Sequence, residues 1–474
     1  MNFYSQWRQA PQLLREDTGF APTERLLQAI WRHQRVRRDK LTTVDGRRVR
    51  VWHPGFWNRG AGPDFRDAVV QLDDDAPQTG DVEIDLTSAD WHRHRHADNP
   101  EYARVILHVI WRATSGSAPA PALLLEPFCD APLIELEQWS TSAVISELPI
   151  EFTGRCRAPL AELPESSITA LLQQAAWVRL QQKAAHLAAV ARHVDWDHAL
   201  WCGLARALGY QHNTWPMQSL AERLPILRDV ARGDPLHWQA LLLGVAGLLP
   251  SLDNTTGASR ALLQSLWDIW WRERDRLREH QLPAGIWQLR GCRPANHPQR
   301  RVALLAQWCA MDDLPRRLEQ WFDTSLPLPQ MPGTLEQCLR GDPDDYWCWH
   351  WTLSGPRQPA PCALLGKQRV GDLAVNVILP WLWARAADSP SRQQRVRECF
   401  LAWPATQQNS VTRLASQRLF AGRRPSVLRS AAGQQGILQI ARDFCQHAPA
   451  TCDACRFPDL VRDFAASPTA ASDS

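Results

Sequence analysis

A segment in which acidic and apolar residues alternate, from Gly80 to Leu86, constrains the fold of this 474-residue chain more than any other. Successive side chains of a β-strand point to opposite faces. Asp81, Glu83 and Asp85 therefore share one face, and the apolar residues between them share the other. The apolar face predicts contact with a hydrophobic core. The segment thus predicts a sheet that carries a patch of carboxyl groups.

The surrounding sequence predicts that this strand belongs to a mixed helix-and-strand unit that ends near residue 150. Helical and two-residue periodicities follow one another in the order helix, three strands, helix, strand, and turn residues separate the strands. The expected elements are a helix over 23–35, strands over 47–52, 67–72, 81–86 and 105–111, a short helix or helical loop over 88–103, and an extra strand over 123–126.

The remainder of the chain predicts a mainly α-helical domain over residues 151–440. A long helix rich in Ala, Leu and Gln is expected over 166–194, and helical periodicity then recurs to about residue 440. The Cys-rich segment 441–460 is expected to form a small metal-binding closure. The small and polar residues of 461–474 predict a disordered tail. The expected fold is therefore an α/β domain over residues 1–150 followed by a mainly helical C-terminal domain.

The overall charge does not by itself indicate a nucleic-acid-binding protein, because 53 basic residues nearly balance 50 acidic ones and leave a net charge of +3. Ten basic residues are concentrated between Glu24 and Arg59, which fits either a track for phosphate groups or a solvated surface. Lysine occurs only at Lys40, Lys183 and Lys367. No lysine is therefore available between residues 41 and 182.

The sequence also bears on the compartment and on the cysteines. The N-terminal segment has no apolar signal-like stretch, and the longest apolar run, 240–249, is about half a bilayer span. We therefore expect a cytoplasmic protein of a bacterium-like cell, with no membrane partner. Twelve cysteines without a secretory signal favour metal binding or buried thiols over disulfides. The oligomeric state is not indicated by the sequence.

A metal site is predicted where Asp64, which follows Gly62 and Pro63, approaches Glu83. Two carboxylates about 6 Å apart repel each other by roughly 3 kcal/mol at an effective dielectric constant of 20, and a bound cation relieves that repulsion. Oxygen ligands of this kind suit Mg²⁺ or Mn²⁺, so Asp64 and Glu83 are expected to be the ligands. The alternative is a solvated strand face on which water screens the charges.

Histidines follow the acidic strand closely. His94 and His96 can face the same side in an extended loop, where they can bind a metal or contact a phosphate group. His108 lies in an apolar strand and is expected to be a hydrogen-bonded core residue. Tyr102 fits either the same cleft or the core.

Several motifs occur together along the chain. They are Gly62-Pro63-Asp64-Phe65, Gly80 to Ile84, Asp90-Trp91 with His94 and His96, residues 102–109, 293–298 and 376–380, and Gln435-Gly436 with the late cysteines. The combination resembles an uncharacterised bacterial family, domain of unknown function 2851, over most of the chain. This resemblance implies no particular activity.

A wider resemblance is to the PD-(D/E)XK nuclease superfamily. Pro63-Asp64 and Glu83 carry it, and Glu24 matches the acidic helix residue of many such exonucleases. It implies a restriction-endonuclease-like N-terminal domain and metal-dependent hydrolysis of phosphodiester bonds in DNA or RNA, with Glu24 assisting. The superfamily pattern ends in Glu-x-Lys, and Asp85 stands where lysine is expected.

The missing lysine leaves two interpretations open. Lysine in that position orients water and stabilises the transition state, so its loss requires another group to complete the site. Asp85, His94 or His96 are the candidates in an active nuclease. The alternative is a non-catalytic nucleic-acid-binding or scaffold protein with a degenerate nuclease fold.

The late cysteines form a second candidate metal site. Cys445, Cys452 and Cys455 include a Cys-x2-Cys spacing that suits a metal. His447 as the fourth ligand predicts zinc. Cys156 as the fourth ligand resembles the iron–sulfur staple of certain PD-(D/E)XK exonucleases. Buried or idle thiols are the alternative.

A turn that contains Arg293, Asn296 and Arg300 precedes a helix expected from Arg301 onward. It predicts either a phosphate-binding site at that helix's N-terminus or a structural corner in which arginines donate to carbonyl groups.

Overall fold

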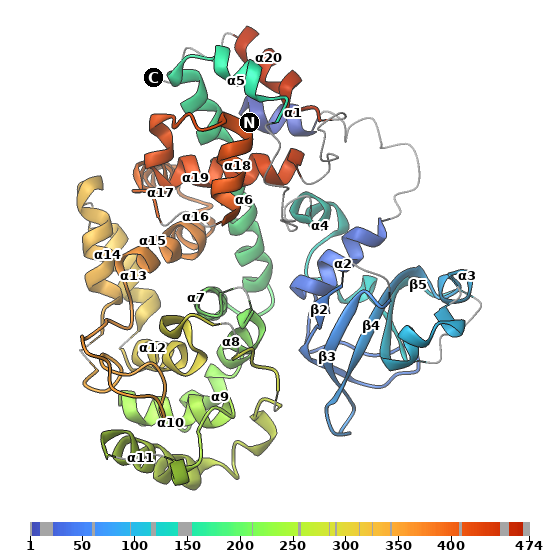
Figure 1. Cartoon of the computed structure of the whole chain (residues 1–474), viewed down its shortest axis with the longest axis vertical. Coiled ribbons are helices and arrows are strands. Elements are labelled where there is room, and N and C mark those ends of the chain that lie inside the picture. Colours follow the sequence, from blue (N-terminus) through green and yellow to red (C-terminus); the bar gives the residue numbers. More distant parts are fainter. Residues whose placement is uncertain are drawn as a thin grey trace.

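Two units lie side by side in the computed structural model of the chain, a sheet unit and a taller stack of helices (Figure 1). The sheet unit combines helices and strands, as the sequence predicts, whereas the second unit is built mainly from helices. The structure describes residues 2–9, 22–58, 62–94, 96–114, 120–140, 154–210, 212–254, 257–283, 285–289, 292–311, 313–324, 326–341, 344–406, 410–445 and 455–467.

The sheet unit is built on one mixed sheet in which the strands have the order β1-β3-β4-β5-β6. The first three are antiparallel, and β4, β5 and β6 run parallel. The short strand β2, which was not predicted, pairs with β3. The strands are β1 (Val49–His53), β2 (Phe56–Trp57), β3 (Phe65–Leu72), β4 (Gln78–Thr87), β5 (Val105–Arg112) and β6 (Ala122–Leu124).

Helix α2 (Glu24–His33) packs on this sheet and delivers its first residue to the acidic strand. Its N-terminus is capped by Thr23, whose side chain accepts from the backbone N–H of Leu26. The buried face, which includes Ile30 and Trp31, packs in the same apolar cluster as β3, β4 and β5. Between β4 and β5 the chain forms α3 (Asp90–Arg93) and the short helices η2 (His96–Asp98) and η3 (Pro100–Arg104). The predicted helical connection over 88–103 is thus confirmed.

The second unit is organised around the 27-residue helix α6 (Glu165–Ala191). This helix packs against α19 (Ala431–Ile440) and α16 (Leu379–Arg385), and its apolar side chains contribute to three buried clusters. Helix α4 (Leu133–Ser140) lies beside α2. The other helices are α5 (Arg157–Glu162), α7 (Trp196–Leu208), α8 (Thr214–Ala221), α9 (Leu224–Arg228), α10 (Pro235–Val245), α11 (Gly257–Glu273), α12 (Pro298–Ala310), α13 (Leu314–Asp323), α14 (Met331–Leu339), α15 (Lys367–Leu373), α17 (Pro390–Ala402), α18 (Ser410–Phe420) and α20 (Phe457–Ala466).

The first helix, α1 (Phe3–Gln9), belongs to the helical unit and not to the sheet. The rings of Phe3 and Phe464 meet edge to face with centroids 5.4 Å apart, and the Tyr4 hydroxyl donates to Asp443 at 2.7 Å. Residues 461–466, expected in a disordered tail, form the end of α20, because Val461 and Phe464 are buried against this cluster. Residues 468–474 of the expected tail lie outside the described residues.

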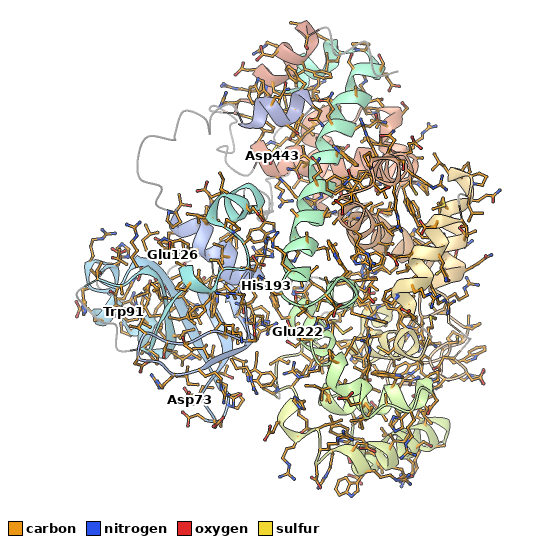
Figure 2. All side chains as sticks on the ribbon, turned by 180° about the vertical axis from the view of Figure 1, so that it is seen from behind. Asp73, Trp91, Glu126, His193, Glu222 and Asp443 are labelled. Carbon is orange, nitrogen blue, oxygen red and sulfur yellow. The ribbon has the colours of Figure 1, made fainter. Side chains whose placement is uncertain are left out.

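Polar contacts join the two units. Arg38 pairs with Glu222 at 2.8 Å, and His193 approaches the backbone carbonyl of Asp130 at 3.2 Å. Figure 2 labels His193 and Glu222 where the helices face the sheet unit. Arg35 forms a buried ion pair with Asp130 at 2.7 Å. These two arginines of the basic segment are therefore used inside the molecule. No helix among the described residues is long and apolar enough to cross a bilayer.

Candidate metal centre

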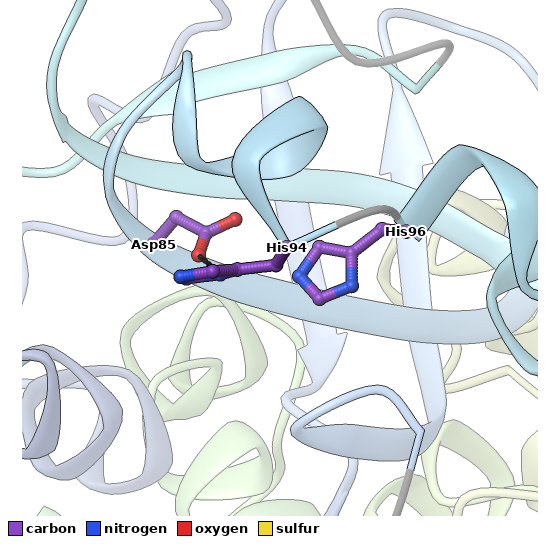
Figure 3. Close-up of side chains that lie close together, drawn as sticks. All are labelled: Asp85, His94 and His96. Atoms are coloured by element: carbon purple, nitrogen blue, oxygen red, sulfur yellow. Dashed lines mark ion pairs between the residues drawn. The ribbon is translucent and has the colours of Figure 1, made fainter.

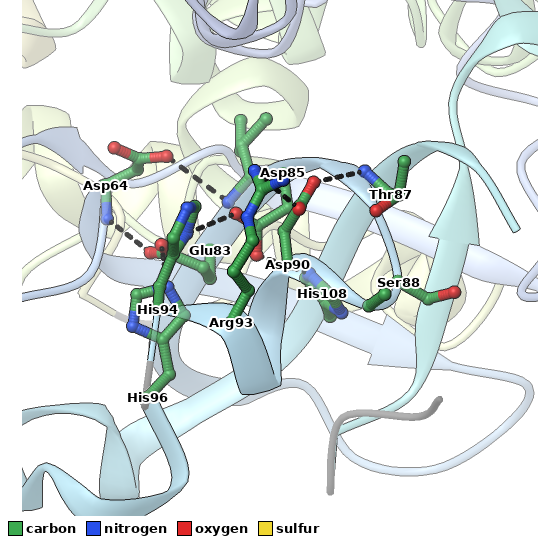
Figure 4. Close-up of polar contacts among 12 residues, drawn as sticks. Asp64, Glu83, Asp85, Thr87, Ser88, Asp90, Arg93, His94, His96 and His108 are labelled. Carbon is green, nitrogen blue, oxygen red and sulfur yellow. Dashed lines mark hydrogen bonds and ion pairs between the residues drawn. The ribbon is translucent and has the colours of Figure 1, made fainter. Parts of the chain in front are cut away.

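Carboxyl and imidazole groups from four neighbouring segments converge beside strand β4 (Figure 4). Glu83 and Asp85 lie on β4, and Asp64 immediately precedes β3, which pairs with β4 through Phe65 and Val82. His94 follows α3, and His96 begins η2. The sheet and the helical connection thus bring together residues that the sequence separates.

Direct contacts hold the carboxyl groups in place. The backbone N–H of Asp64 donates to Glu83 Oε2 at 3.0 Å, and the N–H of Ile84 donates to Asp64 Oδ2 at 3.3 Å. Gln28 Nε2 donates to Asp64 Oδ1 at 2.9 Å and to Glu24 Oε1 at 3.1 Å. Gln28 therefore bridges Glu24 and Asp64, one helical turn after Glu24, and joins α2 to the site.

The two histidines approach the carboxylates of β4. His94 Nδ1 lies 3.3 Å from Asp85 Oδ1, and His96 Nε2 lies 3.2 Å from Glu83 Oε1. One ligand atom from each of Asp85, His94 and His96 falls within 4.8 Å of the other two (Figure 3). Among the residues that the structure describes, this trio is the one group of His, Cys, Asp or Glu side chains that meets this condition. All three members were expected as candidates to complete the site in the absence of the lysine.

A second layer of residues supports this group. His108 on β5 is fully buried, and its Nε2 lies 3.0 Å from Asp85 Oδ2. The ring of Tyr102 stacks on His96 at 4.0 Å between centroids, and Trp91 packs against the rings of both. His108 is a buried strand residue as predicted, but its partner is a carboxylate of the site. His108 lies opposite Glu83 in the pairing of β4 with β5, and this register is the signal that identifies it as a neighbour of the site.

Burial and mutual repulsion make the carboxyl groups hold their protons. The pKa of Glu83 rises to about 9, because the group is buried and because Asp64 lies beside it. The pKa of Asp64 rises to about 7 through burial and the neighbouring Glu24. Burial and Asp85 raise the pKa of Glu24, and burial lowers the pKa of His96. Glu24, Asp64 and Glu83 thus hold their protons more strongly than ordinary carboxyl groups, and His96 favours its neutral form.

The residues fit a divalent transition-metal ion. The Nε2 of His96 is buried and forms no aligned hydrogen bond within the described structure, although Glu83 Oε1 lies 3.2 Å away. A neutral imidazole nitrogen that faces carboxylate oxygens offers its lone pair to a metal. Two imidazoles with carboxylates suit Mn²⁺, Fe²⁺ or Zn²⁺ better than Mg²⁺, which prefers oxygen ligands alone.

Two acidic residues near the strand do not join the group. Asp81 Oδ1 accepts from the backbone N–H of Asp67 at 3.1 Å, near a shift in the register between β4 and β5. Asp90 accepts from the N–H of Thr87 at 2.9 Å and pairs with Arg93 at 2.7 Å. Lys40, the nearest lysine in the sequence before the site, pairs with Asp39 at the surface.

Only some of the late cysteines lie among the described residues. Cys156 precedes α5, Cys445 ends the π-helical turn η11 (Ala441–Cys445), and Cys455 precedes α20. Cys156 and Cys445 are buried in one apolar cluster, and Cys455 packs against it. Cys452 and His447 lie outside the described residues. A zinc or iron–sulfur site at these cysteines stays a prediction.

The predicted arginine turn is a structural corner, and α12 already begins at Pro298, so that Arg300 and Arg301 lie in its first turn. Arg300 donates to the backbone carbonyls of His350 and Ala363, each at 2.9 Å, and Arg301 donates to that of Leu364 at 2.9 Å. The guanidinium groups are thus occupied by carbonyls, which is the second of the two alternatives for this turn.

Comparisons with known proteins place the chain in a family. Neither the curated proteins nor the solved structures contain a significant match. The family model described as "Protein of unknown function (DUF2851)" matches residues 24–409, from the first residue of α2 to the segment before α18. Because this match covers most of the chain, including every residue of the candidate metal centre, the chain belongs to the DUF2851 family.

Proposed function

We propose that the protein is a divalent-metal-dependent hydrolase of phosphodiester bonds in DNA or RNA, with its site on β4. The convergence of Asp85, His94 and His96 within 4.8 Å carries this proposal, because it groups three ligand atoms beside further carboxylates. Glu83, in contact with His96, is the fourth proposed ligand. This set keeps Glu83 from the Asp64 and Glu83 pair that the sequence suggests, and Asp85, His94 and His96 take the place of Asp64 as ligands.

Each residue has a proposed role in the reaction. A bound cation supplies positive charge that neutralises the phosphate and makes water more acidic. Asp64, with a pKa of about 7, is suited to accept a proton from the attacking water near neutral pH. Gln28 holds Asp64 and Glu24 in fixed positions. His108 orients Asp85 through their 3.0 Å contact.

The arrangement of elements supports the resemblance to the PD-(D/E)XK superfamily. Helix α2 is followed by antiparallel strands, a helical connection and the parallel strand β5, which is the order that the sequence predicts. Asp64 precedes β3, and Glu83 lies on β4, at the positions on which the resemblance rests. We propose a restriction-endonuclease-like unit in which imidazoles replace the lysine of Glu-x-Lys.

A second candidate is a nucleic-acid-binding protein without cleavage activity. The observation that favours it is the sequence gap without lysine from 41 to 182, together with the surface position of Lys40. A vestigial acidic site would then not cleave nucleic acid, even where it still binds Mn²⁺.

The test combines metal binding with cleavage. Titration calorimetry of the full chain with Mn²⁺ and with Mg²⁺ is followed by nicking assays on end-labelled single- and double-stranded DNA and RNA. We expect Mn²⁺ to bind more tightly than Mg²⁺, and D85N and H96Q each to weaken binding and cleavage by at least about 100-fold. The matched control is H92Q, because His92 lies exposed on α3.

The outcomes separate the two candidates. Metal binding without cleavage of any substrate supports the non-catalytic protein. Cleavage that survives both D85N and H96Q contradicts the proposed site. Absence of Mn²⁺ binding to the wild-type chain rejects the metal centre itself.

A further inference from the structure

A second group of ionisable side chains lies in the helical unit, outside the metal centre. Lys183, on α6, donates to Asn376 Oδ1 and, at 2.8 Å, to Gln435 Oε1. Arg179, one turn earlier on α6, donates through Nε to the same oxygen of Gln435 at 2.8 Å. Three helical segments, α6, α19 and the π-helical turn η9 (Ala374–Ile378), therefore meet at one amine.

The contacts of Lys183 suit an uncharged amine. Both hydrogen-bond partners are neutral amides, and a neutral amine has two N–H groups to donate, which leaves its lone pair available. Among the described residues no carboxylate forms an ion pair with it. Burial lowers its pKa well below the ordinary value, and Arg179 and Arg442 lower it further, while Asp372 acts in the opposite direction.

The helix face that carries Lys183 is partly exposed. Arg179, Lys183 and His186 are spaced four and three residues apart, which places them on one face of α6, and each is partly exposed. The NH1 group of Arg179 has no hydrogen-bond partner within the described structure. Arg442 lies on η11, a second π-helical turn, and such turns occur frequently at functional sites. The amine of a partly exposed lysine residue thus lies within the electrostatic influence of two guanidinium groups.

We propose that Lys183 is the nucleophile of a second site, which takes a small aldehyde or ketone that carries a carboxylate or a phosphate. The lone pair of Nζ adds to the carbonyl carbon, and the carbonyl oxygen takes up a proton from the nitrogen. The resulting carbinolamine loses its hydroxyl group and the remaining N–H proton as water, which leaves a C=N bond. Arg179 and Arg442 attract the anionic group of the ligand.

The chain contains its own controls for a test, because its other lysines, Lys40 and Lys367, are exposed. The full protein is treated at pH 7 with pyridoxal 5′-phosphate, which has an aldehyde and a phosphate, and then with sodium borohydride, which reduces the imine. Peptide mass spectrometry measures the modified fraction of each lysine. Fewer than about one in a thousand ordinary lysines is uncharged at pH 7, so we expect Lys183 to react at least about tenfold faster than the other two.

Further experiments identify the cause of any faster labelling of Lys183. Protein unfolded in urea should label all three lysines to similar extents, and R179Q should reduce labelling of Lys183 by several-fold while Lys40 is unchanged. Pyridoxal, which lacks the phosphate, and glyoxylate, which carries a carboxylate, distinguish the two kinds of anion. Labelling of Lys183 in the folded wild-type protein that does not exceed that of Lys40 overturns the proposal.

Discussion

The metal centre on β4 and the Lys183 cluster on α6 both gather like charges in a protein interior, with opposite signs. At the first, burial and neighbouring acids raise the pKa of Glu83 to about 9. At the second, burial and neighbouring guanidinium groups lower the pKa of Lys183. In each case the uncharged form is favoured. Charge repulsion can thus be relieved by a change of protonation: a carboxyl group keeps a proton at the metal centre, and the amine gives one up at the Lys183 cluster.

The two regions differ in how the repulsion can be relieved further. The carboxylates and imidazoles of the metal centre form a donor set that a cation can join, and cation binding then displaces protons. The Lys183 amine has amide partners, and a ligand can join it only through its lone pair or through the nearby guanidinium groups.

The largest expected effect concerns pH and the metal centre. The pKa of Glu83 rises from its ordinary value of 4.5 to about 9 in the folded protein. Above pH 4.5 the unfolded chain releases this proton while the folded protein keeps it, so the contribution to stability falls as pH rises towards 9. The loss is about 1.4 kcal/mol per pH unit. Urea denaturation in EDTA between pH 6 and 8 should show this slope in the wild type and a smaller one in E83Q. Equal slopes in the wild type and in E83Q would contradict the raised pKa of Glu83.

The next effect concerns the acceptor shared by Lys183 and Arg179. The substitution Q435L removes an oxygen that two buried donors use, so we expect a loss of about 2 kcal/mol in the free energy of unfolding. The matched control is Q394L, because Gln394 lies exposed on α17 and contacts only its helical neighbour Glu398 among the partners described. A change in Q435L no larger than that in Q394L contradicts the proposed packing of the cluster.

A smaller effect is expected from the residue behind the metal centre. His108 contacts Asp85 but not the proposed cation, so H108N should weaken Mn²⁺ binding by about 10-fold and leave the stoichiometry unchanged. Calorimetric titration beside D85N measures the difference. Weakening as severe as that in D85N would make His108 a ligand, and unchanged affinity would remove it from the site.

The smallest effect is expected where charges near the sheet are exposed. Arg104 and Asp67 pair at 3.0 Å with both side chains more than half exposed. Water and salt screen such pairs, so R104A should change the free energy of unfolding by no more than about 0.5 kcal/mol. Chemical denaturation at low and high salt checks this. A change above about 1 kcal/mol would show that exposed charge near the metal centre matters as much as buried charge.

The sequence predicts the elements of the sheet unit well because their periodicities are local. The helix expected over 23–35 and the four main strands appear within a few residues of the expected bounds. Strand alternation also correctly placed Glu83 and Asp85 on the acidic side, but a register shift turns Asp81 towards the N–H of Asp67. Such a shift depends on pairing with neighbouring strands, which a single strand does not encode.

The residues that sequence reasoning missed are those that depend on contacts between distant segments. Gln28 joins the site because α2 packs across the sheet, and its partner Asp64 lies 36 positions away. The Lys183 contacts span 193 and 252 positions, to Asn376 and Gln435. No local sequence pattern predicts these contacts, because they arise from the tertiary packing of helices. The sequences of these helices show only apolar periodicity.

The contact between α1 and α20 has a consequence for the order of folding. Because the first helix of the chain and the last one described pack together, the sheet unit is an insertion between two parts of the helical unit. During synthesis from the N-terminus, all strands of the sheet are available once residue 124 has emerged, whereas the apolar cluster around Tyr4 is complete only with Phe464. The sheet unit can therefore assemble on the ribosome before α20, against which α1 packs, has been synthesised.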